Sequence, residues 1–194
     1  MTDMTTATTI DEQTIIIQAQ QGNRHAFSQL VKLYQKRAYG IAYQYVGNRE
    51  DALEMAQDSF VKAYKAMKRF DTQMPFYPWL YRIVKNTCLN YLKKKKRRGE
   101  VSLNAMMHHG FDIASSNRDG ERRVHLTELR DSIAKAMNRL SESHREIVLL
   151  RHVHDMAYSE IADSLDIPRG TVMSRLHGAR RNLREAMEVT QETG

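Results

Sequence analysis

The feature that most limits how this chain can fold is a helix, a tight turn and a second helix, which the sequence predicts between residues 155 and 184. Apolar residues recur at three- and four-residue spacing on both sides of the turn, at Ile161, Ala162 and Leu165 and then at Val172 and Leu176. They hold the two helices together along one face. The opposite face carries arginines suited to phosphates and base edges in a major groove, namely Arg169, Arg175, Arg180, Arg181 and Arg184. The segment therefore predicts a helix-turn-helix that binds DNA; the alternative is a solvated helix pair with a basic surface.

Composition favours an all-α chain with a polyanionic partner. The 194 residues are 41% hydrophobic and include only three prolines and nine glycines, which suits one or two small helical domains with cores. The formal charge is +7. The single cysteine, Cys88, excludes an intramolecular disulfide and is predicted to be a buried structural thiol. No signal peptide or membrane-spanning pattern is visible, so we expect a cytoplasmic protein.

The helical pattern divides the chain into two domains. We expect a disordered tail over residues 1–10, a first helical domain over 11–98, a flexible linker over 99–124 and a second helical domain over 125–190. In the first domain, apolar stripes predict a short helix ending near Gly22, helices over 24–46 and 49–68, a loop over 70–78 and a helix starting at Trp79. In the second, Ser143 and Glu146 have the spacing of a capping box.

A second nucleic-acid surface is predicted at the end of the first domain. Six consecutive cations, residues 93–98, follow a helix that begins with aromatic residues. Arg82, Asn86 and Asn90 recur every four residues and so share one helical face. Aromatic rings beside such a face can stack unpaired bases while lysines hold the backbone. The alternative is that Trp79 and Tyr81 are core residues, which we favour for Trp79 because tryptophan is usually largely buried.

Three motifs, in this order along the chain, resemble the sigma-70 family of bacterial sigma factors, in its small extracytoplasmic-function class. The first is an acidic stretch that is similar to the family's helix for docking on the clamp coiled coil of RNA polymerase. The resemblance implies a polymerase-binding surface made of Glu50, Asp51, Gln57, Asp58 and Phe60.

The other two motifs resemble the family's DNA-binding segments. FYPWLYRIVKN, residues 76–86, is similar to the promoter-melting segment, whose preceding loop captures a flipped base of the minus-ten element. This implies minus-ten contacts by Ala66, Phe70, Tyr77, Arg82, Asn86, Asn90 and Lys93. IPRGTVMSRLHGAR, residues 167–180, resembles the minus-35 recognition helix, which implies contacts by Arg169, Thr171, Ser174, Arg175, His177 and Arg180.

Several residues depart from the family pattern. Met173 and Gly178 stand where relatives often carry arginine, so the minus-35 sequence cannot be borrowed from them. Asp166 occupies the turn where glycine is frequent, which is tolerable because Asp enters the left-handed region more readily than most residues. Ala157 replaces the usual Ser or Thr helix cap, which leaves Asp155 as a candidate cap.

The resulting prediction is a non-enzymatic promoter-specificity subunit that needs no cofactor. Its partners are core RNA polymerase, promoter DNA and, as the resemblance implies, an anti-sigma factor. The alternative is a stand-alone helix-turn-helix repressor or activator, which would bind DNA tightly without polymerase, as a dimer at a palindrome. A metal-dependent enzyme is disfavoured because the histidines, such as His152 and His154, have no Cys or carboxylate at ligand spacing, and we expect most of them on the surface or in the linker.

Overall fold

The structure is a computed structural model that describes residues 11–99 and 120–192. All regular structure in these two ranges is helical, as predicted. The expected tail over 1–10 and most of the expected linker lie outside the described residues.

The first half consists of α1 (Glu12–Gln20), α2 (Arg24–Val46), α3 (Arg49–Ala66), a 3-10 turn η1 (Met67–Arg69) and α4 (Phe76–Arg97). Asparagine side chains cap the N-termini of two of these helices. Before α2, Asn23 Oδ1 accepts hydrogen bonds from the backbone amides of His25 and Ala26 at 2.9 and 3.1 Å. Before α3, Asn48 Oδ1 accepts one from the backbone amide of Asp51 at 2.7 Å. Gly47 ends α2 in the left-handed conformation, with φ 74°. The predicted bounds of α2 are thereby confirmed.

The second half consists of α5 (Gly120–Arg139), α6 (Glu142–His152), α7 (Tyr158–Leu165) and α8 (Arg169–Glu192). The turn between α7 and α8 contains Asp166 with φ 54°, as its place in the sequence predicted. The residues that hold α8 against its neighbours, Val172, Leu176 and Ala179, are at most 1% exposed. The helix-turn-helix is therefore present and closely packed.

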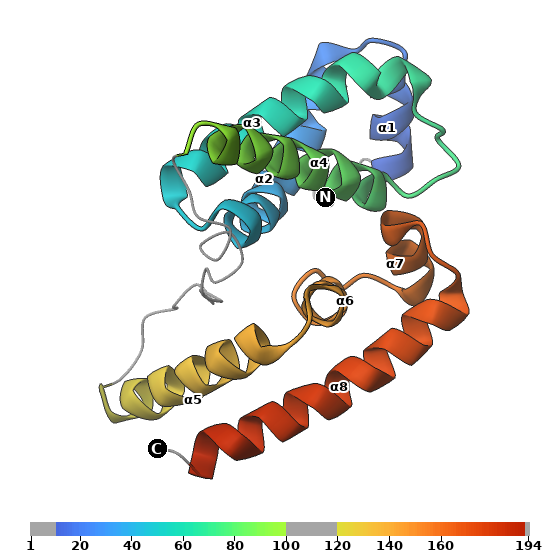
Figure 1. The fold of residues 1–194 in the computed structure, drawn as a ribbon. Coiled ribbons are helices and arrows are strands. Elements are labelled where there is room, and N and C mark those ends of the chain that lie inside the picture. Colours follow the sequence, from blue (N-terminus) through green and yellow to red (C-terminus); the bar gives the residue numbers. More distant parts are fainter. Residues whose placement is uncertain (1–10, 100–119, 193–194) are drawn as a thin grey trace, which may run out of the picture.

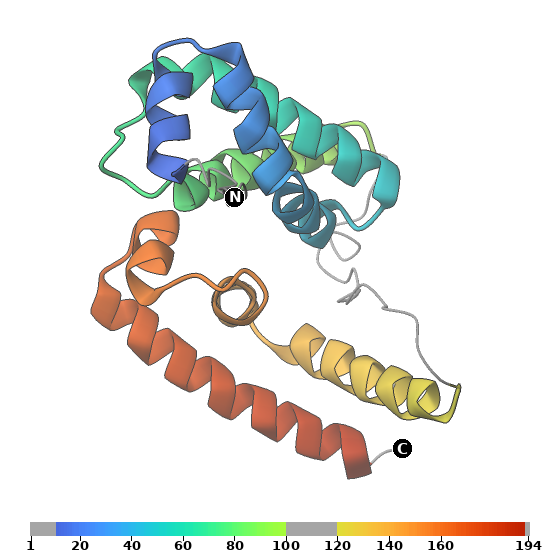
Figure 2. The ribbon, with the colours of Figure 1, turned by 180° about the vertical axis from the view of Figure 1, so that it is seen from behind.

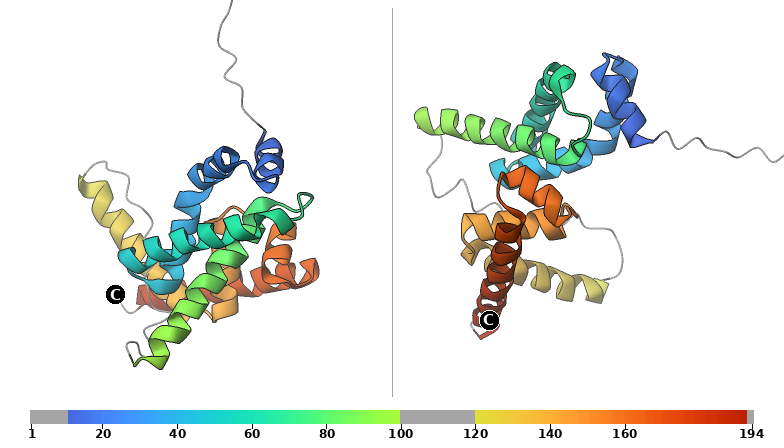
Figure 3. Two further views of the ribbon diagram at one scale, coloured as in Figure 1. Left: turned by 90° about the horizontal axis from the view of Figure 1, so that it is seen from above. Right: turned by 90° about the vertical axis from the view of Figure 1, so that its right-hand side faces the viewer.

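The two halves lie one above the other and touch. Figure 1 shows α1–α4 as one group and α5–α8 as a second group beneath it, with α7 next to the start of α4. Seen from behind, α5 and α8 run side by side below α1 and α2 (Figure 2). The right-hand view of Figure 3 keeps α7 directly under α4. The buried residues of both halves form one continuous apolar cluster.

Four local predictions are wrong. Helix α4 begins at Phe76 rather than Trp79, because Pro78 falls in the first turn, where its missing N–H has no helical partner to lose. Helix α5 begins at Gly120, inside the predicted linker. Ser141, not Ser143, caps α6, and the Glu146 side chain turns away to another helix. Asp155 does not cap α7; instead Glu160 Oε2 accepts the Ala157 amide at 2.7 Å.

Candidate functional surfaces

Helix α3 presents a face with an acidic rim and an apolar centre. Of the predicted polymerase-binding residues, Glu50, Gln57 and Asp58 are exposed. Leu53 lies between them in sequence and is 53% exposed, and Val61, two turns further on, is 52% exposed. Single exposed apolar residues are ordinary, but two on one helix face beside carboxylates form a surface suited to a protein partner. Sequence reasoning missed Leu53, although its spacing from Glu50 and Gln57 indicates the same face.

Two residues predicted for that surface make contacts within the chain instead of facing a partner. Phe60 is only 8% exposed and belongs to the core. The Asp51 carboxylate accepts hydrogen bonds from Lys95 Nζ at 2.7 Å and from Asn48 Nδ2 at 2.5 Å. Burial alone raises the pKa of this carboxyl, but the bonds from Lys95 and Asn48 outweigh it, so the pKa lies below its ordinary value. Asp51 therefore joins α3 to the end of α4.

One face of α4 is polar and open to solvent. Arg82, Asn86, Asn90 and Lys93 are all exposed, at the spacing that places them along one side of the helix. Ala66, at the end of α3, is half-buried. The basic run that closes α4 continues this face beyond Lys93.

The aromatic residues predicted to trap bases are packed inside. Phe70 is 4% exposed, with its ring centroid 5.8 Å from Phe76 and 4.7 Å from Trp79. Tyr77 is 5% exposed and stacks on Tyr34 with centroids 5.5 Å apart. In this arrangement neither ring offers a free face to a base. Trp79 is half-buried, and its ring packs against those of Phe70 and Phe76.

Two groups from outside the base-trapping segment cover Tyr77. The Arg37 guanidinium lies 4.8 Å from the centroid of its ring. The hydroxyl is 2.9 Å from Nδ1 of His154, which belongs to the loop before α7 in the second half. His154 is 5% exposed and is therefore an exception to the expectation that most histidines lie on the surface or in the linker; His152 is exposed.

The outward side of α8 carries the predicted recognition residues. Arg169, Ser174, His177 and Arg180 are exposed, and Thr171 and Arg175 are half-buried. Ser174 Oγ donates to the Thr171 carbonyl at 3.1 Å, which keeps that side chain close to its own helix. Met173 is 55% exposed among these polar side chains. This surface can enter a major groove by its first three turns.

Among the residues that the structure describes, no group of three or more His, Cys, Asp or Glu side chains is placed to hold a metal ion. Within the same residues, no helix has the length and apolar character needed to cross a membrane. Cys88 is fully buried, as predicted, and burial raises the pKa of its thiol to about 12.

Comparison with known proteins identifies the family of the chain. The Sigma-70 region 2 family matches residues 30–98, and the Sigma-70 region 4 family matches residues 130–183. The ECF RNA polymerase sigma-E factor of Haemophilus influenzae is 32% identical over 183 residues, covering 92% of this chain and 96% of that protein. The ECF RNA polymerase sigma factor SigW of Bacillus subtilis is 31% identical over 176 residues, covering 89% of this chain and 94% of that protein.

A solved structure shows the same fold. The sigma factor RpoE of Bartonella quintana, in complex with the anti-sigma factor NepR, superposes with a TM-score of 0.64 at 23% identity, covering 84% of this chain and 97% of that one. Identity above 30% along nearly the whole length of two relatives, together with both family matches, is decisive. The chain belongs to the extracytoplasmic-function (ECF) sigma factors of the sigma-70 family.

Proposed function

We propose that this chain binds core RNA polymerase through α3 and directs it to promoters through α4 and α8. It acts as a specificity subunit and catalyses no reaction itself. The observation that carries the proposal is the presence of three separate exposed surfaces, one acidic and apolar and two polar and cationic, in a family whose members are RNA polymerase sigma factors.

The α3 surface suits the polymerase. It combines an exposed apolar residue, Leu53, with the polar and acidic side chains of Glu50, Gln57 and Asp58. The negative charge of these carboxylates disfavours contact with DNA and favours contact with a basic protein surface. Asp51 contributes indirectly, because its pairing with Lys95 joins α3 to the end of α4. Phe60 supports the helix from inside the core.

The two DNA surfaces have different tasks. The exposed asparagines of α4, Asn86 and Asn90, can hydrogen-bond the edges of unpaired bases, while Arg82 and Lys93 bind phosphates. The first turns of α8 read duplex DNA in the major groove. Capture of bases by Phe70 and Tyr77 requires that their covering groups move. An anti-sigma factor is the expected third partner, as for the Bartonella quintana relative.

Run-off transcription with purified core polymerase and a promoter library tests the proposal. Asn86→Ala should reduce open-complex formation and leave polymerase affinity unchanged, since Asn86 is exposed on α4 and is not one of the α3 residues proposed to bind polymerase. Gln35→Ala, which removes an exposed amide from α2, serves as the matched control. Arg175→Ala should weaken binding to the minus-35 element. If Arg175 contacts a phosphate, the slope of the logarithm of the binding constant against the logarithm of the salt concentration should also become less steep by about one. A chain that neither binds core polymerase nor changes the transcription start site contradicts the proposal.

A further inference from the structure

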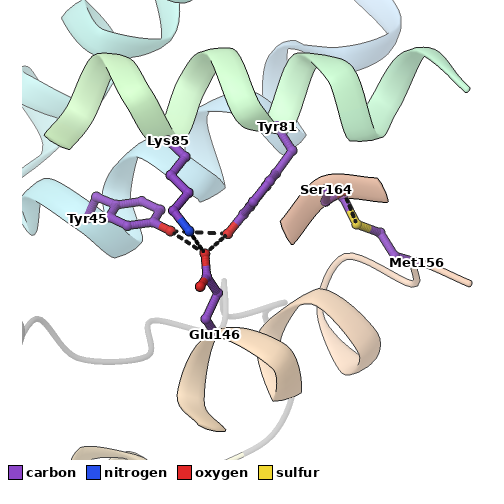
Figure 4. Close-up of polar contacts among 6 residues, drawn as sticks. All are labelled: Tyr45, Tyr81, Lys85, Glu146, Met156 and Ser164. Atoms are coloured by element: carbon purple, nitrogen blue, oxygen red, sulfur yellow. Dashed lines mark hydrogen bonds and ion pairs between the residues drawn. The ribbon is translucent and has the colours of Figure 1, made fainter. Parts of the chain in front are cut away.

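One carboxylate oxygen joins the two halves of the molecule. Glu146 Oε1, on α6, accepts hydrogen bonds from Tyr45 OH at 2.9 Å, Tyr81 OH at 2.6 Å and Lys85 Nζ at 2.5 Å. Tyr45 lies on α2, and Tyr81 and Lys85 lie on α4, so all three donors belong to the first half. Figure 4 shows the three side chains converging on the carboxylate. These four residues are called the interdomain cluster below.

The interdomain cluster is shielded from water. The side chains of Glu146 and Lys85 are 17% and 25% exposed, and Tyr81 is 2% exposed. Burial raises the pKa of both tyrosine hydroxyls well above the ordinary value, so they remain protonated donors at any physiological pH. A shielded carboxylate with three donors is a stronger contact than a surface ion pair, and removing its acceptor leaves shielded donors without partners.

The closed arrangement cannot span a promoter. The elements centred near positions −10 and −35 are about 25 base pairs apart, or about 85 Å along B-form DNA. Helix α7 packs on α4 and leads directly into α8. At 1.5 Å per residue α4 is about 33 Å long and α7 about 12 Å, so with the width of one helix the start of α8 lies within about 55 Å of any residue of α4.

Closure also covers part of the α4 surface that is proposed to bind the minus-ten element. Lys85 neighbours Arg82 and Asn86 on α4, but in the closed chain its ammonium is paired with a carboxylate instead of a DNA phosphate. The Tyr77 hydroxyl is bonded to His154 of the second half at 2.9 Å. Both groups become available when the halves separate.

We propose that Glu146 holds the free chain in a closed state, that this state excludes simultaneous binding of the two promoter elements, and that core polymerase binds the open state. The inference rests on the proposed function, which requires both elements to be bound at once. Binding to a minor open state lowers the apparent affinity by the fraction of chain that is open. Loss of the carboxylate therefore tightens polymerase binding.

Energy transfer between two dyes measures closure in the full chain. Lys65→Cys on α3 and Arg184→Cys on α8 supply exposed attachment points, and Cys88 does not compete because it is fully buried. Glu146→Ala should lower the transfer efficiency, and Glu146→Gln, which keeps an acceptor oxygen but loses the charge, should lower it less. The control is Glu142→Ala, an exposed carboxylate on the same helix, which should leave the efficiency unchanged. A far-UV circular dichroism spectrum identical to the wild type verifies that each variant is folded.

The second measurement is the affinity of the unlabelled variants for core polymerase. A charge-assisted contact of this kind corresponds to roughly a tenfold to hundredfold change in the closing equilibrium, so Glu146→Ala should bind core at least several-fold more tightly than the wild type. Unchanged energy transfer in Glu146→Ala overturns the inference, and so does an opened variant with unchanged affinity. If Glu146→Ala opens the chain but neither form binds core polymerase, the proposed function fails instead.

Discussion

His154 should make the folded chain sensitive to mild acid. Its ring is 5% exposed, with Nδ1 2.9 Å from Tyr77 OH and Nε2 3.3 Å from Gln44 Oε1. A neutral ring satisfies both contacts, accepting from the tyrosine and donating to the amide. Burial first, and then the nearby Arg37 charge, lower the pKa of His154 to about 4. Acidification must therefore force a charge into a site that disfavours it.

The size and direction of the effect follow from the two pKa values. In the unfolded chain the ring has its ordinary pKa of 6.5. Because the folded pKa is lower, the neutral His154 ring makes its full contribution to the free energy of unfolding above pH 6.5. This contribution declines as the pH falls from 6.5 to about 4 and changes no further below that. A shift of one pKa unit corresponds to about 1.36 kcal/mol. The free energy of unfolding should therefore fall by about 3 kcal/mol over the whole range from pH 6.5 to about pH 4, and by about 2 kcal/mol between pH 7 and pH 5. The side-chain carboxylates with ordinary pKa values are still mostly ionised at pH 5.

Urea unfolding at pH 7 and pH 5 measures this loss, and an NMR titration of the His154 ring reports its pKa directly. His154→Gln keeps a polar side chain that cannot titrate, so it should lose about 2 kcal/mol less than the wild type between the two pH values. His177→Gln, at an exposed position on α8, is the control. Burial, Arg180 and Arg151 also lower the pKa of His152, but that contribution is common to all three proteins and cancels. A His154 that titrates near 6.5, or an unchanged pH dependence in His154→Gln, refutes the reasoning.

Three further outcomes are expected. Leu53→Ala should weaken core-polymerase binding by several-fold with little change in the melting temperature, because the residue is 53% exposed; Val153→Ala, 45% exposed in the second half, should leave the dissociation constant unchanged. Cys88 should resist iodoacetamide in the native chain and react only in denaturant, as mass spectrometry would show, since burial raises its pKa to about 12. Asn23→Ala should lower the free energy of unfolding by about 1 kcal/mol in urea titrations, through loss of the cap on α2; an unchanged midpoint would contradict this.

Most of the fold was predictable because local signals at the ends of helices agree with the apolar pattern inside them. Helix α2 lies between a capping asparagine, Asn23, and a left-handed glycine, Gly47, and both could be recognised from the sequence. The start of α4 could not, because Pro78 reads as a breaker when its position within the first turn is unknown. A capping residue is similarly ambiguous when two serines are close together, and the structure selects Ser141 rather than Ser143.

The candidate surfaces were predictable to the extent that helical periodicity decides exposure. Arg82, Asn86 and Asn90 share a face of α4 whatever that helix packs against, and all three are exposed. The same reasoning could not foresee that Asp51, in an acidic face, would pair with Lys95, because a contact across 44 residues depends on how two helices cross. Nor could it foresee that Tyr77 would be covered, because one covering group, Arg37, lies on α2 and the other, His154, comes from the second half of the chain.

Glu146 shows why the contact between the halves had no signature in the sequence. Glu146 follows Ser143 at the spacing of a capping box, so the sequence already offers a local role for this side chain. Its actual donors lie 61 to 101 residues earlier, on two different helices, and none of them forms a motif with it. Contacts between domains depend on how the two domains lie against each other, so the helical pattern within each domain leaves them undetermined. If the chain opens to bind promoter DNA, as proposed, closure can be weakened by changing one side chain, Glu146, that does not belong to the apolar core.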